Sequence, residues 1–257
     1  MIATAVTNGV ATVTLNRPDK HNAFDDGLIA ALTDVIAGHG ADPAVRTIVL
    51  RGAGKSFSAG GDLNWMRRMA EYTEAENLAD ARRLEVLMRT LNGVAKPTVA
   101  VVHGAAYGGG VGLVACCDIA LASDIATFAL SEVKLGLVPA VIAPYVVAAM
   151  GARAARRYFL TAETFSALEA HRLGLVHDVV PGHMLDAAVD RLVGKLADNG
   201  PRAVAGAKAL VHGVTTRASA EIPDFTARMI ADARASDEGR EGVSAFLEKR
   251  PPAWRVQ

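Results

Sequence analysis

Pro97-Thr-Val-Ala-Val-Val-His-Gly-Ala-Ala-Tyr-Gly-Gly-Gly-Val-Gly112 is the stretch that decides the fold of this 257-residue chain. Its β-branched residues, Thr98 to Val102, predict a buried strand, and the glycines Gly108 to Gly110 precede an apolar helical segment, Val111 to Cys116. Glycine lets a ligand approach the backbone, and the amides that begin a helix have no partner within it. The stretch therefore predicts a site for negative charge: a phosphate, a nucleotide, or an anion that develops only in a transition state.

Composition narrows the class of protein. Lys plus Arg and Asp plus Glu both number 27, so the formal net charge is zero, which disfavours nucleic acid and anionic membranes as partners. No apolar run reaches membrane-spanning length, and the N-terminus lacks the features of a signal peptide, so we expect a cytoplasmic protein. Cys116 and Cys117 are adjacent, which favours reduced core thiols over a disulfide, and no metal-ligand spacing occurs.

Strands alternate with helices until a helical C-terminal end. Alternation predicts parallel strand pairing, and a trailing helical block often packs on a neighbour. Strands are expected at 2–7 and 10–15, around an Asn8-Gly9 hairpin turn, and at 47–50, 98–102, 118–122, 127–130 and 176–180. Helices are expected from Asp25 or Asp26 to Gly38 and Gly40, from a Thr73 and Glu76 capping box to about Leu91, at 141–150 before Gly151, and at 184–198, 201–213, 219–235 and 238–248. Residues 51–63 and 131–139 are expected to be loops.

A weak internal echo links two segments of the chain. Residues 48–63 and 99–111 share the order strand, glycine loop, helix. Two such units side by side would direct two backbone amides at one point.

Two nucleotide-binding motifs are incomplete. The string from Gly52 to Ser56 lacks the first glycine of a phosphate-binding loop, and the dinucleotide pattern that begins at Gly110 starts too far beyond its strand. For His103 we expect a structural role.

Glu132 is the candidate acid or base. It lies between the apolar strings 128–130 and 135–138, where burial would raise its pKa and suit it to proton transfer. The alternative is a solvated loop residue, with the glycine loops serving only as tight turns. Two amide donors and one carboxylate together form a set that can polarise a carbonyl, hold an enolate and move a proton at the neighbouring carbon.

These residues resemble the crotonase superfamily, the enoyl-CoA hydratases and isomerases. The resemblance implies an α/β spiral of ββα units over residues 1–195, a C-terminal helical trimerisation region over 196–257, and trimers or hexamers built as paired trimers. The blocks that carry it are Asn16–Pro18 with Asn22-Ala23, Ser56–Leu63, His103–Gly110, Cys117–Ile119, Ser131-Glu132, Leu135–Leu137, Ala170 with Gly174–Val176, and Phe246–Pro251.

The resemblance also implies the site. Substrates of the superfamily are acyl-CoA thioesters, so CoA enters with the substrate and no separate cofactor or metal is expected. The implied oxyanion-hole amides are those of Ala59 and Gly109, and the implied catalytic residue is Glu132. The implied substrate or CoA contacts are Lys20, His21, Ala23, Gly61, Asp62, Leu63, Tyr107, Phe246 and Lys249, although Asp62 could instead cap the following helix.

One departure from the hydratase pattern is Gly112. Hydratases of the superfamily use two glutamates, and the first falls at Gly112 here, while the second matches Glu132. A single glutamate is similar to the double-bond isomerases. However, the string from Leu130 to Val141 is similar to the methylglutaconyl-CoA hydratase branch, which takes branched or carboxylated enoyl-CoAs. We favour hydration, with isomerisation and non-catalytic acyl-CoA binding as alternatives. Acyl chain length and the choice between trimer and hexamer stay open.

Overall fold

The computed structural model describes residues 1–255. The chain winds as a spiral, and each turn of the spiral adds one strand to each of two sheets. The first sheet contains β3 (Thr47–Gly52), β5 (Thr98–Val102) and β7 (Ile119–Ser123), paired in parallel. The strands that follow them, β4 (Ser56–Ala59), β6 (Ala105–Tyr107) and β8 (Thr127–Ala129), pair in parallel in the second sheet. Because helices follow the second strand of each turn, the expected α/β spiral of ββα units is confirmed.

The edges of both sheets are antiparallel or short. β1 (Ile2–Thr7) and β2 (Val10–Leu15) form the predicted hairpin, and Asn8 and Gly9 at its turn both have positive φ, as a type I′ turn requires. β10 (Asp178–Val180) extends the other edge of the first sheet, in parallel with β7. β9 (Phe165–Ser166) closes the second sheet, antiparallel to β8.

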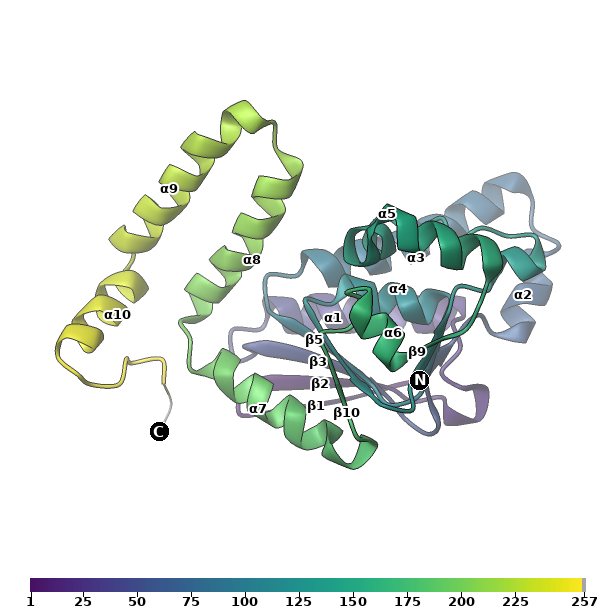
Figure 1. The fold of residues 1–257 in the computed structure, drawn as a ribbon, viewed down its shortest axis with the longest axis horizontal. Coiled ribbons are helices and arrows are strands. Elements are labelled where there is room, and N and C mark those ends of the chain that lie inside the picture. The colour runs from purple at the N-terminus through teal and green to yellow at the C-terminus, as the bar shows by residue number, and fades with distance from the viewer. Residues whose placement is uncertain (256–257) are drawn as a thin grey trace.

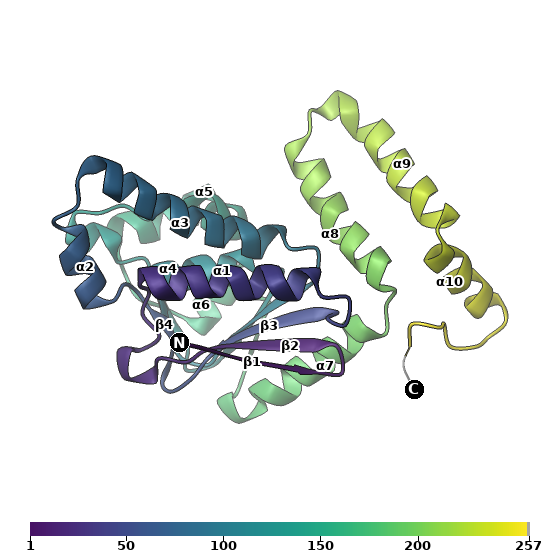
Figure 2. The same cartoon turned by 180° about the vertical axis from the view of Figure 1, so that it is seen from behind.

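Helices cover both faces of the first sheet (Figures 1 and 2). Alternate residues of β3 divide between two cores: Ile48 and Leu50 pack in the main core, whereas Val49 packs against α7 (Leu185–Ala197). The helices of the main core are α1 (Asp26–Ala41), α3 (Glu74–Gly93), α4 (Gly109–Cys116), α5 (Ala143–Thr161) and α6 (Ala167–Arg172).

Helix boundaries agree with the sequence in part. The Thr73 and Glu76 capping box begins α3 as predicted, and Asp25 caps α1. The expected end of α1 at its glycines is wrong, because the helix continues through Gly38 and Gly40 to Ala41. A Cβ on Gly40 would lie 2.5 Å from Val94 Cγ2, so this glycine serves close packing beside α3 rather than helix termination. The predicted helix stop at Gly151 is confirmed in part, because Gly151 has non-helical φ and ψ of 77° and 152° and two helical segments meet there at a kink within α5.

Two segments expected to be loops contain regular structure. Residues 51–63 include β4, and α2 (Leu63–Met69) begins at their end. Residues 131–139 include a 3-10 turn over Glu132–Leu135. Further 3-10 turns span Pro18–Lys20, Gly182–Met184 and Ser219–Glu221. These short elements lack the apolar periodicity from which longer ones are recognised.

The C-terminal helices form an arm that extends away from the sheets (Figures 1 and 2). It comprises α8 (Pro201–Thr216), α9 (Ile222–Ala235) and α10 (Asp237–Leu247), and residues 256–257 of the predicted 196–257 region lie outside the described residues. Lys208 ties α8 to the core through a 2.8 Å ion pair with Asp118. The arm exposes large apolar side chains, among them Val211, Ile230, Val243, Phe246 and Leu247. Across residues 1–255, no helix is long and apolar enough to cross a membrane.

We expect Gly110→Ala to destabilise the fold by about 1–3 kcal/mol, because its Cβ would lie 2.4 Å from the backbone oxygen of Ser58. Gly38→Ala is the matched control. Gly38 is also helical but has no neighbour within 4 Å of the added Cβ, so this change should stabilise the protein by about 0.5–1 kcal/mol. Urea unfolding of both variants checks the expectation, and equal shifts would contradict it.

Candidate active site

A cleft of about 480 Å³ lies where the two glycine loops meet α2, α3 and the segment after β8. Most of its wall is apolar, and the ionisable groups on it are Glu132 and Asp80. The lining residues are Phe24, Gly60, Gly61, Trp65, Met66, Met69, Asn77, Asp80, Ala81, Leu84, Gly108, Gly109, Ser131, Glu132 and Leu135 to Ile142.

The register of β4 and β6 places the two glycine loops side by side. Ala59 pairs with Tyr107 in this parallel ladder, so the residues that follow bring Gly60 next to Gly108 and Gly61 next to Gly109. A Cβ built on Gly108 would lie 3.8 Å from the Gly60 Cα atom, which confirms their close approach. The juxtaposition expected from the internal echo is therefore present.

The amide predicted at Ala59 is not available to a ligand. Its N–H donates to the backbone oxygen of His21 at 3.0 Å, and Ala59 does not line the cleft. The prediction for Ala59 is wrong because the loop before α1 lies against this end of β4 and uses the amide.

Gly61 supplies the free amide instead. The Phe24 N–H donates to the Gly60 oxygen at 2.8 Å, and the Asp62 N–H donates to the Phe24 oxygen at 2.7 Å. The Gly60 C=O and the Gly61 N–H belong to one trans peptide unit and point in opposite directions, so the Gly61 N–H points away from Phe24. It has no acceptor among residues 1–255. Gly61 lines the cleft, as does Gly109.

Gly109 is the first residue of α4, and its N–H precedes the first bond of the helix, which Val111 donates to the Gly108 oxygen. The positive end of the helix dipole reinforces this position as a place for negative charge. Among residues 1–255, neither the Gly61 N–H nor the Gly109 N–H has an acceptor, so two unpaired amides lie close together at the ends of the glycine loops.

The carboxyl group of Glu132 lies over the Gly108 loop. A Cβ on Gly108 would be 3.1 Å from Glu132 Oε1, so only glycine leaves this space to the carboxylate. Glu132 Oε2 is buried and has no hydrogen-bond partner among the described residues. Burial raises the pKa of Glu132, as the sequence led us to expect.

The position of the absent first glutamate is filled by apolar side chains. A Cβ on Gly112 would lie 2.3 Å from Ile142 Cγ2 and 3.1 Å from Met88 Cε. A glutamate at Gly112 would therefore displace Ile142. Because Ile142 and Met88 fill this space, Glu132 is the carboxylate that lies next to the glycine loops.

The predicted substrate contacts in the N-terminal loop lie together beside the cleft. Lys20 Nζ and Arg17 both bind Asp62 Oδ2, at 2.9 Å and 2.8 Å. The hydrogen bond from Lys20, together with the amides of Asn64 and Trp65 at the start of α2, holds the pKa of Asp62 well below its usual range. Asp62 caps α2 by accepting from Asn64, which is the alternative weighed from the sequence.

The remaining predicted residues of this region have defined places. His21 Nδ1 lies 3.0 Å from Ser56 Oγ, and Ala23 is buried with its oxygen accepting from Arg17. Leu63 begins α2 and is exposed, and the Tyr107 hydroxyl lies 3.1 Å from Thr127 Oγ1. His103 Nε2 bonds the Gly54 oxygen at 2.9 Å, in keeping with a structural role.

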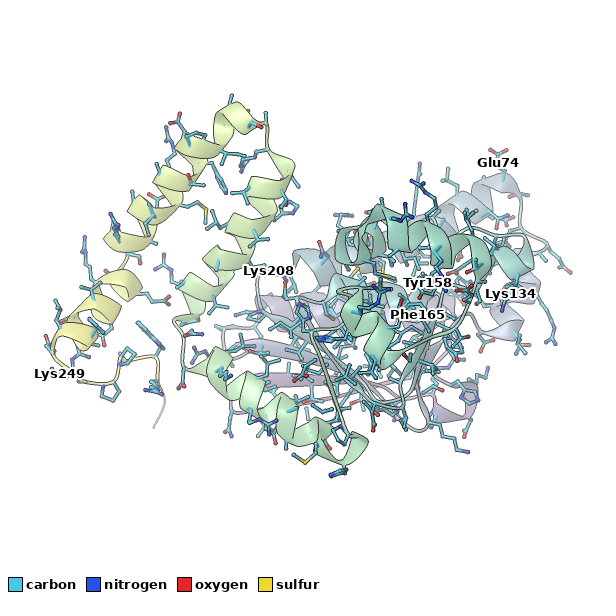
Figure 3. The ribbon with its side chains drawn as sticks, viewed as in Figure 1. Glu74, Lys134, Tyr158, Phe165, Lys208 and Lys249 are labelled. Carbon is cyan, nitrogen blue, oxygen red and sulfur yellow. The ribbon has the colours of Figure 1, made fainter. Side chains whose placement is uncertain are left out.

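Phe246 and Lys249 do not join the site within one chain. Figure 3 shows Lys249 at the end of the arm, on the side of the molecule opposite Lys134, which belongs to the same 3-10 turn as Glu132. The Phe246 side chain is 82% exposed.

Sequence reasoning missed most of the cleft wall, notably Phe24, Trp65, Asp80 and Ile142. A signal existed for Asp80. It lies four residues before Leu84 and eight before Met88, on the apolar stripe of α3, where a charged residue is out of place.

Comparisons with known proteins agree with this fold and site. The family described as enoyl-CoA hydratase/isomerase matches residues 5–257, and the chain belongs to that family. A solved enoyl-CoA hydratase from Shewanella pealeana is 46% identical, with a TM-score of 0.95 over 98% of this chain and 95% of that one. The mevalonyl-coenzyme A hydratase of Beauveria bassiana is 33% identical over 96% of this chain and 91% of its own length. The 2,3-dehydroadipyl-CoA hydratase of Escherichia coli is 32% identical over 96% and 95%.

We expect Glu132→Gln to stabilise the protein more at pH 8 than at pH 4. Because the folded pKa of Glu132 is raised, the stability linked to this group is present at low pH and is lost as pH rises through that pKa. The variant has no charge to bury. Urea unfolding at both pH values measures the difference, with the exposed Glu71→Gln as control. A gain that is larger at pH 4 would contradict the assignment.

Proposed function

We propose that this enzyme adds water across the α,β double bond of an enoyl-CoA thioester. The observation that carries the proposal is the meeting of two unpaired amides, Gly61 and Gly109, with the buried carboxyl group of Glu132 in one apolar cleft. The relatives described as hydratases support the same reaction class.

The two amides act on the thioester oxygen. Attack at the β-carbon pushes electrons into the carbonyl, and the resulting enolate oxygen accepts hydrogen bonds from the N–H groups of Gly61 and Gly109. Donors that are fixed before the reaction stabilise this charge without reorganisation, and losing one typically costs about 3 kcal/mol of barrier. Gly61 takes the role that the resemblance assigned to Ala59.

Glu132 moves the proton. Its carboxylate accepts a proton from water as the oxygen bonds to the β-carbon, and the same carboxyl group then delivers that proton to the α-carbon. Both groups therefore add to one face. A raised pKa suits this double use, because it brings the acid and base forms closer in free energy at neutral pH.

Isomerisation is the second candidate, and the packing at Gly112 favours it. Ile142 fills the space of a second carboxylate, and a single base suffices to take a proton from one carbon and return it to another. Offering 2-enoyl-CoA and 3-enoyl-CoA in parallel separates the two reactions. Formation of a 3-hydroxyacyl product from the 2-enoyl thioester supports hydration, whereas a shift of the bond alone supports isomerisation.

Several finer points also stay proposals. We propose a homotrimer or a pair of trimers, supported by the exposed apolar side chains of the arm. In such an assembly Phe246 and Lys249 could reach CoA bound to another copy. The contacts of Lys20, His21, Ala23, Asp62, Leu63 and Tyr107 with CoA, a cytoplasmic location and the absence of a cofactor stay predictions. So does a preference for branched or carboxylated chains such as methylglutaconyl-CoA.

Glu132→Gln should lower kcat for hydration by at least about 100-fold, the lower end of a typical acid-base contribution, while acyl-CoA binding stays nearly intact. The amide keeps the size of the side chain but cannot accept the proton. Stopped assays that resolve the product, together with calorimetric titration of a saturated acyl-CoA, measure both quantities. Retained turnover would remove Glu132 from the mechanism. If the unmodified protein binds acyl-CoA but turns over none of the enoyl-CoA substrates, this result supports the non-catalytic alternative.

A further inference from the structure

One wall of the cleft carries a carboxylate that the proposed reaction does not use. Asp80 lies on α3, lines the same cleft as Glu132 and is only 4% exposed. Its neighbours on that face of the helix, Leu84 and Met88, are apolar. A buried carboxylate among such residues is unfavourable unless its oxygens accept hydrogen bonds.

Asp80 is only half satisfied by the protein. Its Oδ1 accepts from Arg83 at 2.7 Å, and Arg83 lies on the outer side of α3 with a side chain that is 49% exposed. Oδ2 has no donor among residues 1–255, yet, unlike Glu132 Oε2, it is not sealed from solvent. Because Asp80 lines the cleft, the accessible oxygen is available to whatever occupies the cleft.

Asp80 is too far along α3 to replace the missing first glutamate. Met88 contacts the space beside Gly112, and Asp80 precedes Met88 by eight residues. At 1.5 Å per residue, this is about 12 Å along the helix axis. Asp80 therefore belongs to the part of the cleft that would hold the acyl chain beyond the reacting carbons.

The chemistry of Oδ2 discriminates between acyl chains. A purely apolar chain would cover the oxygen and leave it without a partner, and a chain that ends in a carboxylate would bring a second negative charge to it. A hydroxyl group donates a hydrogen bond to Oδ2 and satisfies it. The apolar remainder of the wall, including Met66, Met69 and Leu84, suits the methylene groups of the chain.

We propose that Asp80 selects acyl-CoA thioesters whose chain carries a hydroxyl or another neutral hydrogen-bond donor beyond the double bond. This inference rests on the proposed function and narrows it, since it favours neutral polar chains over the carboxylated ones that the sequence resemblance allows.

The test uses three 2-enoyl-CoA substrates of equal chain length that end in a methyl, a hydroxyl or a carboxylate group. For the unmodified full-length protein, kcat/KM for the hydroxyl substrate should exceed the other two by about tenfold or more, as expected where an unpaired site group rejects the analogue. Asp80→Leu should reverse the preference in favour of the methyl end. Asp80→Asn, which keeps shape but removes charge, should raise the carboxylate substrate relative to the hydroxyl one.

Glu85→Gln is the matched control. Glu85 is also a carboxylate of α3 paired with an arginine, Arg89, but it lies outside the cleft, so the ratios between substrates should not change. The proposal is overturned if the unmodified protein prefers the carboxylate or methyl end, or if the Asp80 variants change all three substrates equally, as a structural role would.

Binding of three saturated acyl-CoAs with the same ends separates this inference from the proposed function. If the protein hydrates none of the enoyl substrates but its dissociation constants follow the hydroxyl preference and lose it in Asp80→Leu, Asp80 keeps its role and the proposed reaction fails. If hydration proceeds without any Asp80-dependent preference, the reaction stands and the selectivity proposal fails.

Discussion

The parallel pairing of β4 with β6 is the constraint on which the site depends. Its register aligns Ala59 with Tyr107, and this fixes which glycines of the two following loops are neighbours. A shift of one residue would turn each amide to the opposite side of its strand. α4 also packs so closely on β4 that only glycine fits at Gly110, where a Cβ would lie 2.4 Å from the backbone oxygen of Ser58.

The N-terminal loop completes this arrangement from the other side. The Asn22 side chain is fully buried and is held by the backbone of Arg17, Ala53 and Ser56. Ser58 Oγ donates to the Asn22 oxygen at 2.9 Å, while Ala59 donates to His21. The Asn16–Pro18 and Asn22-Ala23 blocks therefore hold in place the loop that leaves the Gly61 amide free, which gives the residues of these blocks a structural role.

The apolar packing at Gly112 shapes the chemistry as strongly as the polar groups do. Ile142, which precedes α5, and Met88 of α3 both lie beside Gly112, the position at which the resemblance to hydratases implies a second glutamate. The proposed mechanism consequently assigns every proton to Glu132. Among the other polar side chains of the cleft wall, Asp80 is the charged one, and it lies farther from the glycine loops.

The sequence by itself determined the elements that are long or clearly capped and the position of the buried carboxyl group, Glu132. Runs of β-branched residues predicted the long strands of the first sheet, and the capping box predicted the start of α3. The apolar strings on either side of Glu132 predicted that its pKa is raised. β4 and β6 were missed because they are short and rich in small residues, and their pairing lies between segments far apart in the chain. Only the tertiary structure decided that Gly61 rather than Ala59 is free, that Ile142 fills the place of the absent glutamate, and that Asp80 enters the cleft. The physical reason is that hydrogen-bond partners, filled volume and burial arise from contacts between distant segments, whereas local patterns report only the preferences of single elements.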